Sequence, residues 1–139
     1  DLQTWKNLII TYKRLEKVID NFMPQSRRDN RYCQNLTSIS EATINRASNI
    51  GELRAVFDYN RYHKVNLEAY ARHRTVEFRQ HGGSTNFTKM SAWIHFLSKM
   101  ITFAKQGKVQ NNTTLQNVPF LTESEKLYFR LRTKKLAAC

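Results

Sequence analysis

Cysteines and long apolar runs are scarce in this chain. Its 139 residues include two cysteines, Cys33 and Cys139, which lie far apart and form no CxxC pair. We therefore expect neither a disulfide framework nor a metal site built on such a pair, and a reducing, cytoplasmic setting is the default. No apolar run approaches the roughly 20 residues that a membrane-spanning helix needs, and no signal peptide is visible.

Signatures of common enzyme sites are also lacking. No GxxxxGK[ST] loop occurs, and although Gly82 and Gly83 could let the backbone approach a phosphate, a plain turn after a strand is favoured. No serine or cysteine has the context of a nucleophile, so hydrolase functions have little support. His63, His73 and His95 do not have the spacing of metal ligands, and His95, beside the apolar stripe of a predicted helix, is expected to be a packing residue.

Acidic residues are outnumbered by basic ones. The chain has 11 Asp and Glu against 23 Lys and Arg, a formal net charge of +12. Such a surface attracts nucleic acid, ATP, acidic peptides or anionic lipid, although it is also compatible with a solvated surface that binds nothing in particular. The 40% of hydrophobic residues argues against disorder, and the length suits one domain, residues 1–139, with one core.

Four helices are predicted from hydrophobic periodicity and capping residues. The first spans residues 4–22, with Thr4 as its cap, and the second spans 41–58 with a weak point near Ser48 and Gly51. The third begins at Asn86 or Thr88 and reaches about residue 105, and the fourth follows a capping box at 122–125. Their predicted buried residues are Trp5, Leu8, Ile9, Tyr12, Leu15, Ile19 and Phe22 in the first, Met90, Trp93, Ile94, Leu97, Ile101 and Ala104 in the third, and Leu127, Tyr128 and Leu131 in the fourth.

Two strands are predicted, over residues 62–70 and 74–81, because apolar and polar side chains alternate there. Residues 71–73 are short enough to join them as an antiparallel hairpin, so the expected fold class is α+β. Two strands alone do not make a stable sheet. Either the helices cover this hairpin, or sequence outside this chain supplies further strands, and we favour the second.

One face of the second strand carries the most informative side chains. Glu77 lies between two basic groups, Arg79 and His81, and this is costly on a half-buried strand unless the charges are used. Glu77 offers an oxygen ligand suited to magnesium, Arg79 offers a planar fork suited to phosphate or carboxylate, and His81 could orient or donate. Together they suit phosphoryl transfer; ordinary ion pairs on a solvent-facing strand are the alternative.

A basic cluster at Arg27, Arg28 and Arg31 follows Pro24. It could bind a phosphate or an acidic substrate group, and a solvated loop is the alternative.

Several segments occur together in a recognisable order. They are the helix with Tyr12, Glu16 and Asp20, residues 24–33, residues 61–67, residues 74–86, and Lys89 with Trp93. In this order they resemble the C-terminal signature of the amidoligase family, which belongs to the glutamine synthetase-like ATP-dependent carboxylate–amine ligases.

The resemblance implies an α+β fold in which an antiparallel sheet, packed by about four helices, faces the active site. It also implies ATP and Mg²⁺, activation of a substrate carboxylate as an acyl phosphate, and attack by an amine to form an amide. The substrates would be acidic and amine small molecules or peptides. By this resemblance Glu77 binds the metal, Arg79 and Arg74 are catalytic, and the ATP contacts are Arg79, Arg27, Arg28 and His81.

One part of the family pattern is absent from these residues. The family's N-terminal half carries acidic metal-ligand strands and a His-x-His element, and the chain begins at Asp1, almost within a helix pattern. We therefore expect a C-terminal part of a longer enzyme, completed by an N-terminal segment of the same protein.

Two other functions remain open. A nucleic-acid-binding module predicts a continuous basic stripe with Tyr59, Tyr62 or Tyr70 exposed for stacking, but no RRM, KH or helix-turn-helix signature is evident. A non-catalytic interaction domain derived from a ligase predicts the same fold with a filled or closed cleft.

Overall fold

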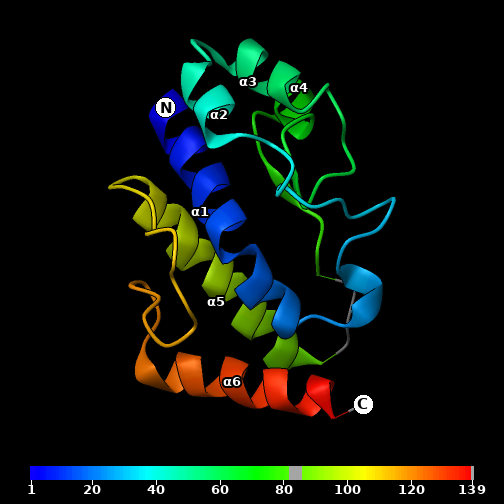
Figure 1. The fold of residues 1–139 in the computed structure, drawn as a ribbon, viewed down its shortest axis with the longest axis vertical. Helices are drawn as coiled ribbons and strands as arrows, with labels where there is room; N and C mark the ends of the chain where they lie inside the picture. Colours follow the sequence, from blue (N-terminus) through cyan, green and yellow to red (C-terminus); the bar gives the residue numbers. More distant parts are fainter. Residues whose placement is uncertain (82–85, 139) are drawn as a thin grey trace.

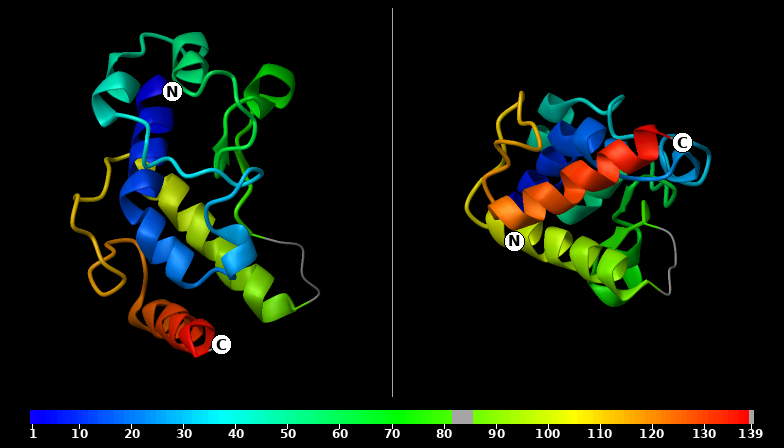
Figure 2. Two further views of the ribbon diagram at one scale, coloured as in Figure 1. Left: turned by 45° about the vertical axis from the view of Figure 1, so that its right-hand side comes forward. Right: turned by 90° about the horizontal axis from the view of Figure 1, so that it is seen from below.

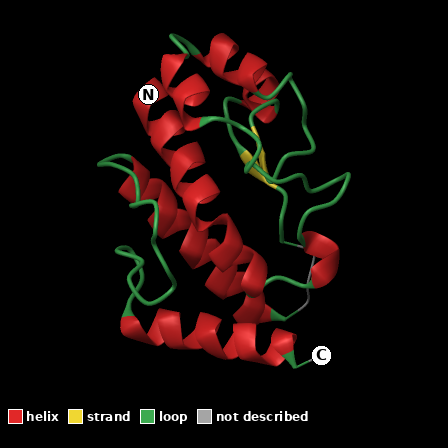
Figure 3. Cartoon of the chain, in the orientation of Figure 1, coloured by secondary structure: helices red, strands yellow, loops and turns green. Residues whose placement is uncertain are grey.

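Helix α1 is the element against which most of the other helices pack (Figure 1). The computed structural model describes residues 1–81 and 86–138. Within them the elements are α1 (Leu2–Asn21), η1 (Gln25–Arg27), α2 (Glu41–Arg46), α3 (Ile50–Val56), β1 (Val65–Asn66), α4 (Ala69–His73), β2 (Glu77–Phe78), α5 (Phe87–Ala104) and α6 (Glu123–Ala137). The fold class is α+β, as predicted, with a small antiparallel sheet among the helices (Figure 3).

The helices meet at two ends of α1. Helix α5 lies beside α1 and runs in the opposite direction, and α6 crosses the end of this pair where α1 finishes and α5 begins (Figures 1 and 2). Helices α2, α3 and α4 gather near the other end of α1, and the hairpin of β1 and β2 lies beside it. Within the described ranges, no helix combines the length and the apolar character needed to cross a membrane.

The ends of α5 and α6 agree with the predicted boundaries, whereas the first cap and the second predicted helix differ. Asn86 caps α5, and Thr122 forms the predicted capping box with Glu125 at the start of α6. The predicted cap Thr4 is wrong, because its backbone N–H donates to the carboxylate of Asp1, which is the true cap. The predicted helix 41–58 is two helices, separated near Ser48 as its weak point indicated.

The predicted strands are much longer than the real ones. In the hairpin Val65 pairs with Phe78 and Asn66 with Glu77, in antiparallel register. Residues 69 and 70 of the predicted first strand and the predicted connection at 71–73 belong to α4. This helix forms because the side chain of Asn66 accepts from the backbone N–H of Glu68 at 2.9 Å and turns the chain away from the strand direction.

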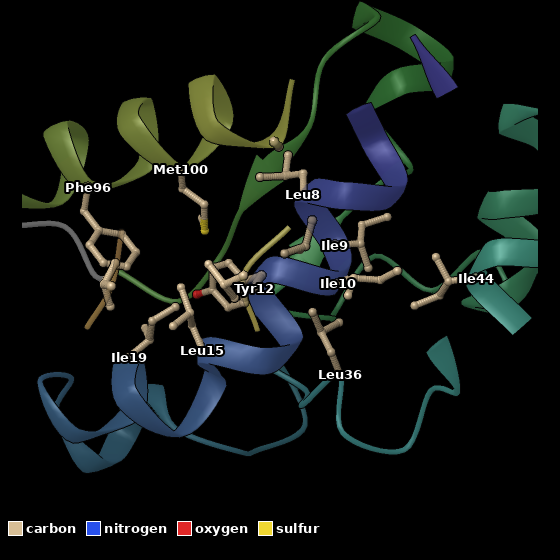
Figure 4. Packing of buried hydrophobic residues seen from close by; sticks show 14 of the residues in the cluster. Leu8, Ile9, Ile10, Tyr12, Leu15, Ile19, Leu36, Ile44, Phe96 and Met100 are labelled. Carbon is tan, nitrogen blue, oxygen red and sulfur yellow. The ribbon is translucent and has the colours of Figure 1, made fainter. Parts of the chain in front are cut away.

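The hydrophobic core forms around α1. Ile10 points toward Ile44 of α2, while Phe96 and Met100 of α5 point toward the face of α1 that carries Leu15 (Figure 4). These five side chains are at most 1% exposed. The apolar stripe predicted for the first helix is therefore confirmed in its main part.

Some predicted packing residues face solvent instead. Ile94 on α5 and Leu127 and Leu131 on α6 are 55%, 45% and 56% exposed, and His95 is exposed as well. Helix α6 buries Lys126 and Phe129, so its inner face is turned away from the predicted one. A helix with few apolar residues does not determine its buried face by periodicity alone. Gly82 and Gly83 lie outside the described residues.

A buried lysine joins the hairpin to α1. Lys64 is 0% exposed, and its Nζ lies 2.8 Å from Asp20 Oδ1 and 3.9 Å from Glu16 Oε2. Lys64 also donates to Asn35. Lys64 belongs to the polar set of the alternating residues 62–70, and its side chain is turned toward the acidic residues of α1. A buried ammonium requires such partners, because an unpaired charge in the interior is very costly.

A second polar link lies beside Lys64. Gln80, also 0% exposed, donates from Nε2 to Asp20 Oδ1 at 2.6 Å and accepts from the hydroxyl of Tyr12 at 2.5 Å. Glu16 accepts from the backbone N–H of Leu36 at 2.7 Å. The carboxylates of α1 therefore fix both the hairpin and the loop that precedes α2.

Replacing the buried ammonium tests this arrangement. We expect Lys64→Met to lower the free energy of unfolding by about 3–5 kcal/mol, because it leaves Asp20 and Glu16 without their buried cation. Urea denaturation of the variant and of Lys17→Met, an exposed lysine of α1, measures this difference. Equal stabilities for the two variants would contradict the importance of the Lys64 contacts.

The ion pair of Arg14 on α1 with Glu41 on α2 should make the stability of the fold depend on pH. Arg14 binds both carboxylate oxygens of Glu41, at 2.5 and 2.9 Å, and donates to the carbonyl of Val109 at 2.7 Å. The hydrogen bond from Arg14 holds the pKa of Glu41 below its ordinary value of 4.5. A depressed carboxylate pKa contributes stability above the unfolded-state pKa, and this contribution is lost as the pH falls through the folded-state pKa.

We therefore expect Glu41→Gln to lower the free energy of unfolding by about 1 kcal/mol at neutral pH, after allowance for solvent screening. The difference from the wild-type chain should shrink as the pH falls below about 4.5, where the unfolded chain already binds the proton. Urea titrations at several pH values measure it. A difference that does not change with pH would rule out the Arg14 contact as its source.

Candidate functional site

The predicted pair of Glu77 and Arg79 forms on the exposed side of β2. Alternation along an extended chain puts residues i and i+2 on one face. Arg79 Nη1 lies 2.7 Å from Glu77 Oε1, with side chains 27% and 49% exposed, respectively. The side chain of Asn66 reaches the same carboxylate oxygen from β1 at 3.5 Å. The opposite face carries Phe78, whose ring stacks on Tyr12 at 5.9 Å.

Two identical tripeptides, Asn30-Arg31-Tyr32 and Asn60-Arg61-Tyr62, border this pair. In each, the asparagine side chain accepts from the tyrosine backbone N–H, at 2.9 Å for Tyr32 and 2.8 Å for Tyr62. This is the local turn that asparagine favours. A parallel bridge between Gln34 and His63 holds the two turns side by side.

The two turns and the residue after β2 bring three arginines around two tyrosines. We call Arg31, Tyr32, Arg61, Tyr62 and Arg79 the arginine–tyrosine cluster. The guanidinium groups of Arg61 and Arg79 lie over the ring of Tyr62, at 5.0 and 5.4 Å from its centroid. That of Arg31 lies 5.4 Å from the centroid of Tyr32. Arg79 Nε also donates to the carbonyl of Tyr32 at 3.3 Å. Arginine over an aromatic face is a favourable contact that keeps its N–H donors in the ring's periphery for other partners.

The positive charge of the cluster acts on Tyr62. Arg61 donates to the Tyr62 hydroxyl at 2.9 Å, and this bond lowers the pKa of the phenol. The charges of Arg61, Arg79 and Arg31 lower it further. A site that favours a phenolate also favours other oxyanions, so the cluster is suited to bind a phosphate or carboxylate group.

Sequence reasoning placed Glu77 and Arg79 together but did not identify Arg61, Tyr62 and Tyr32 as their neighbours. The signal was present, because Asn-Arg-Tyr occurs twice. Its meaning depends on the pairing of Gln34 with His63, which the sequence pattern does not reveal.

Two predicted site residues lie apart from this cluster in their described contacts. Arg74, in the left-handed region at φ 56°, ends α4 and lies over the ring of Tyr70 at 5.3 Å. Arg28 donates to the carbonyl of Met23 and to the side chain of Gln25, both at 3.2 Å. Among the described contacts, none joins either arginine to Glu77 or Arg79.

The other two, Arg27 and His81, line a separate pocket of about 240 Å³, which we call the basic pocket. Its lining comes from the end of α1, η1, α5 and α6, and comprises Phe22, Met23, Pro24, Ser26, Arg27, His81, Lys89, Trp93, Tyr128, Phe129 and Arg132. The imidazole of His81 stacks on the indole of Trp93 at 5.7 Å between centroids. The predicted face of Glu77, Arg79 and His81 is thus divided between two neighbouring sites.

The described residues do not form a complete metal site. They contain no group of three or more His, Cys, Asp or Glu side chains arranged to hold an ion. Glu77 provides a single carboxylate, which is already paired with Arg79. Nor does the basic pocket suit a whole nucleotide, since its 240 Å³ lies below the range of about 300–1,000 Å³ usual for drug-sized ligands.

Comparison with known proteins gives one match. A family model described as "Putative amidoligase enzyme" matches residues 1–101 of the 139. The matched part contains α1, the hairpin, the arginine–tyrosine cluster and most of α5, whereas α6 lies outside it. No curated protein and no solved structure matches the chain.

The electrostatics of the cluster can be measured at Tyr62. We expect Arg61→Gln to raise the pKa of Tyr62, because the substitution removes its hydrogen bond and the nearest positive charge. A pH titration by NMR with ring-labelled tyrosine measures the pKa, and Tyr62→Phe assigns the signal. The control is Arg130→Gln, which removes the charge of an α6 residue that donates to Gln116, and it should leave the pKa of Tyr62 unchanged. An equal rise of this pKa in both variants would show an effect of net charge alone.

Proposed function

The chain belongs to the amidoligase family, and from this membership we propose that it contributes to the active site of an ATP-dependent carboxylate–amine ligase. The observation that supports this best is the Glu77–Arg79 pair on β2, within the matched region and beside Arg61 and Arg31. The ligase would join an acid and an amine, as small molecules or peptides, through an amide bond.

The proposed reaction has two steps. A carboxylate oxygen of the acid attacks the γ-phosphorus of ATP, the bond to the β–γ bridging oxygen breaks, and ADP leaves. The amine nitrogen then attacks the carbonyl carbon of the acyl phosphate, inorganic phosphate leaves, and the nitrogen gives up a proton. Both steps develop negative charge on phosphoryl oxygens, so fixed cationic donors accelerate them.

Arg79 is the residue best placed to contact the transferred phosphoryl group. A guanidinium has five N–H donors. Contacts with described residues use two of them, one on Tyr32 and one on Glu77. The remaining donors are available to an anion, and packing on Tyr62 fixes the orientation of the fork.

Glu77 would supply one oxygen ligand to magnesium, which in such reactions neutralises phosphate charge. One carboxylate does not hold this ion, so the proposal requires further acidic ligands from an N-terminal segment of the same protein. The half-exposed carboxylate of Glu77 is compatible with such completion. Among the described residues Arg74 contacts Tyr70, and its proposed catalytic role rests on the resemblance alone.

One observation favours a second function, the binding of single-stranded nucleic acid. Tyr32 and Tyr59 are each 56% exposed, and an arginine lies over each ring. Exposed aromatics with basic neighbours form stacking platforms for bases. Against it, Glu77 places a carboxylate within the arginine–tyrosine cluster, where it would repel a phosphate backbone.

Calorimetric titration with ATP and magnesium tests the ligase proposal. It should be carried out on this chain and on the protein that carries the N-terminal segment. In the latter we expect Glu77→Gln and Arg79→Ala each to weaken ATP binding by about 10–100-fold, the loss of a charge-assisted contact. The pair Arg54 and Glu68, joined at 2.9 and 3.0 Å, provides matched controls: Arg54→Ala and Glu68→Gln should leave the affinity unchanged.

The competing result is also specific. If the longer protein does not bind ATP, and this chain binds single-stranded RNA with an affinity that falls steeply with salt, the ligase proposal fails and the nucleic-acid function replaces it.

A further inference from the structure

The basic pocket gathers three cations that have no acidic neighbour in its lining. Arg27 comes from η1, Lys89 from the first turn of α5, and Arg132 from α6. No aspartate or glutamate lines the pocket. Within residues 1–81 and 86–138, none of the three side chains is in an ion pair. Like charges that converge without a counter-ion raise the free energy of the folded state, and an anion bound among them removes this penalty.

The lining of the pocket also contains aromatic side chains that belong to the core. Phe22, Trp93 and Phe129 are 4%, 5% and 4% exposed. The ring centroids of Phe22 and Phe129 lie 4.4 Å apart, and those of Phe22 and Trp93 lie 6.3 Å apart. Such packing fixes these side chains, so the pocket is formed before a ligand enters, and a flat apolar group is the complement of its surface.

The size of the pocket limits the ligand. A volume of about 240 Å³ accommodates a single ring with its acidic group rather than a larger molecule. Guanidinium groups bind carboxylate and phosphate oxygens equally through paired N–H donors, and the ammonium of Lys89 adds a point charge. The chemistry therefore selects an oxyanion attached to one flat apolar group.

We propose that the basic pocket binds such a ligand, an aromatic carboxylate or phosphate monoester, with Arg27, Lys89 and Arg132 on the oxyanion and the apolar group beside Tyr128, Trp93 and Phe129. As a role, we assign it to the acid substrate of the ligase, and this role rests on the proposed function, whereas the binding does not. His81 and Arg79 are two residues apart, so their Cα atoms are at most about 7 Å from each other. A ligand in the pocket would thus lie close to the proposed phosphoryl contact.

Helix α6 contributes lining residues to the pocket that lie outside the family match. Tyr128, Phe129 and Arg132 lie outside the residues that match the family, while the arginine–tyrosine cluster lies within them. In the proposed ligase, the chemistry shared with the family would thus depend on β2. Helix α6 would contribute to the selection of the ligand.

The indole of Trp93 provides a direct readout of binding. The chain has two tryptophans, and Trp5 packs on Tyr70 away from the pocket. In a Trp5→Phe background the fluorescence therefore reports on Trp93 alone. We would titrate this protein with benzoate, phenyl phosphate, inorganic phosphate and the neutral analogue benzamide. Benzoate or phenyl phosphate should bind at least about 10-fold more tightly than benzamide, since only they bring the charge; comparison of these two distinguishes the carboxylate from the phosphate.

Variants then locate the site. We expect Arg132→Gln and Arg27→Gln each to weaken binding by about 10-fold, while Lys134→Gln, which removes an exposed charge of the same helix, should have little effect. Circular dichroism checks that each variant is folded. Equal binding of benzamide and benzoate, or equal effects of Arg132→Gln and Lys134→Gln, would overturn the proposal.

The two proposals fail separately. If benzoate binds and ATP does not bind to the longer protein, the pocket is supported and its role in a ligase falls. If ATP binds and neither benzoate nor phenyl phosphate does, the assignment of the pocket is overturned and the ligase proposal stands. Glu77→Gln should reduce ATP binding only, because Glu77 does not line the pocket.

Discussion

The ammonium of Lys64 has no contact with solvent, and the position of the hairpin depends on its neutralisation. The partners come from α1, through Asp20 and Glu16, and from the following loop, through Asn35. Gln80 reaches the same Asp20 from the far end of the hairpin. Because the desolvated charge tolerates few arrangements, β1 and β2 are held against α1 in one orientation although the sheet itself is very short. Lys64 and Gln80 point toward α1. Glu77 and Arg79 are therefore left on the exposed side of the hairpin.

Much of the fold could be predicted from local signals. The ends of α5 and α6 follow from Asn86 and from the capping box at Thr122, and the stripe of α1 follows from periodicity. The strands were overestimated because the alternation of apolar and polar side chains at 62–70 was taken as evidence of one long strand. Both faces are buried there, and the polar one is buried by its charge partners on α1, which no local pattern shows. The exposed Leu127 and Leu131 have the same origin, since the buried face of α6 is decided by its contact with Phe22 and Phe96.

The site was predictable to a similar extent. The spacing of Glu77 and Arg79, together with the resemblance of the surrounding segments, identified the central pair and the family. The separation of His81 from that pair was not predictable, because it depends on stacking with Trp93 after β2 has ended. The part that Arg132 plays in the basic pocket could not be predicted, because it requires α6 to cross α1 and α5, a long-range arrangement.

The bridge between Gln34 and His63 has a mechanical consequence. The backbone N–H of Gln34 donates to the carbonyl of Tyr62 at 2.7 Å, and its own carbonyl accepts from Lys64 at 3.0 Å. The turn that carries Arg31 and the turn that carries Arg61 are thereby joined through the backbone of Gln34, and the contact of the Tyr32 and Tyr62 rings, with centroids 5.7 Å apart, joins them again. Because backbone and side-chain contacts both connect the two turns, the arginine–tyrosine cluster rests on one continuous unit of backbone and not on two independent loops.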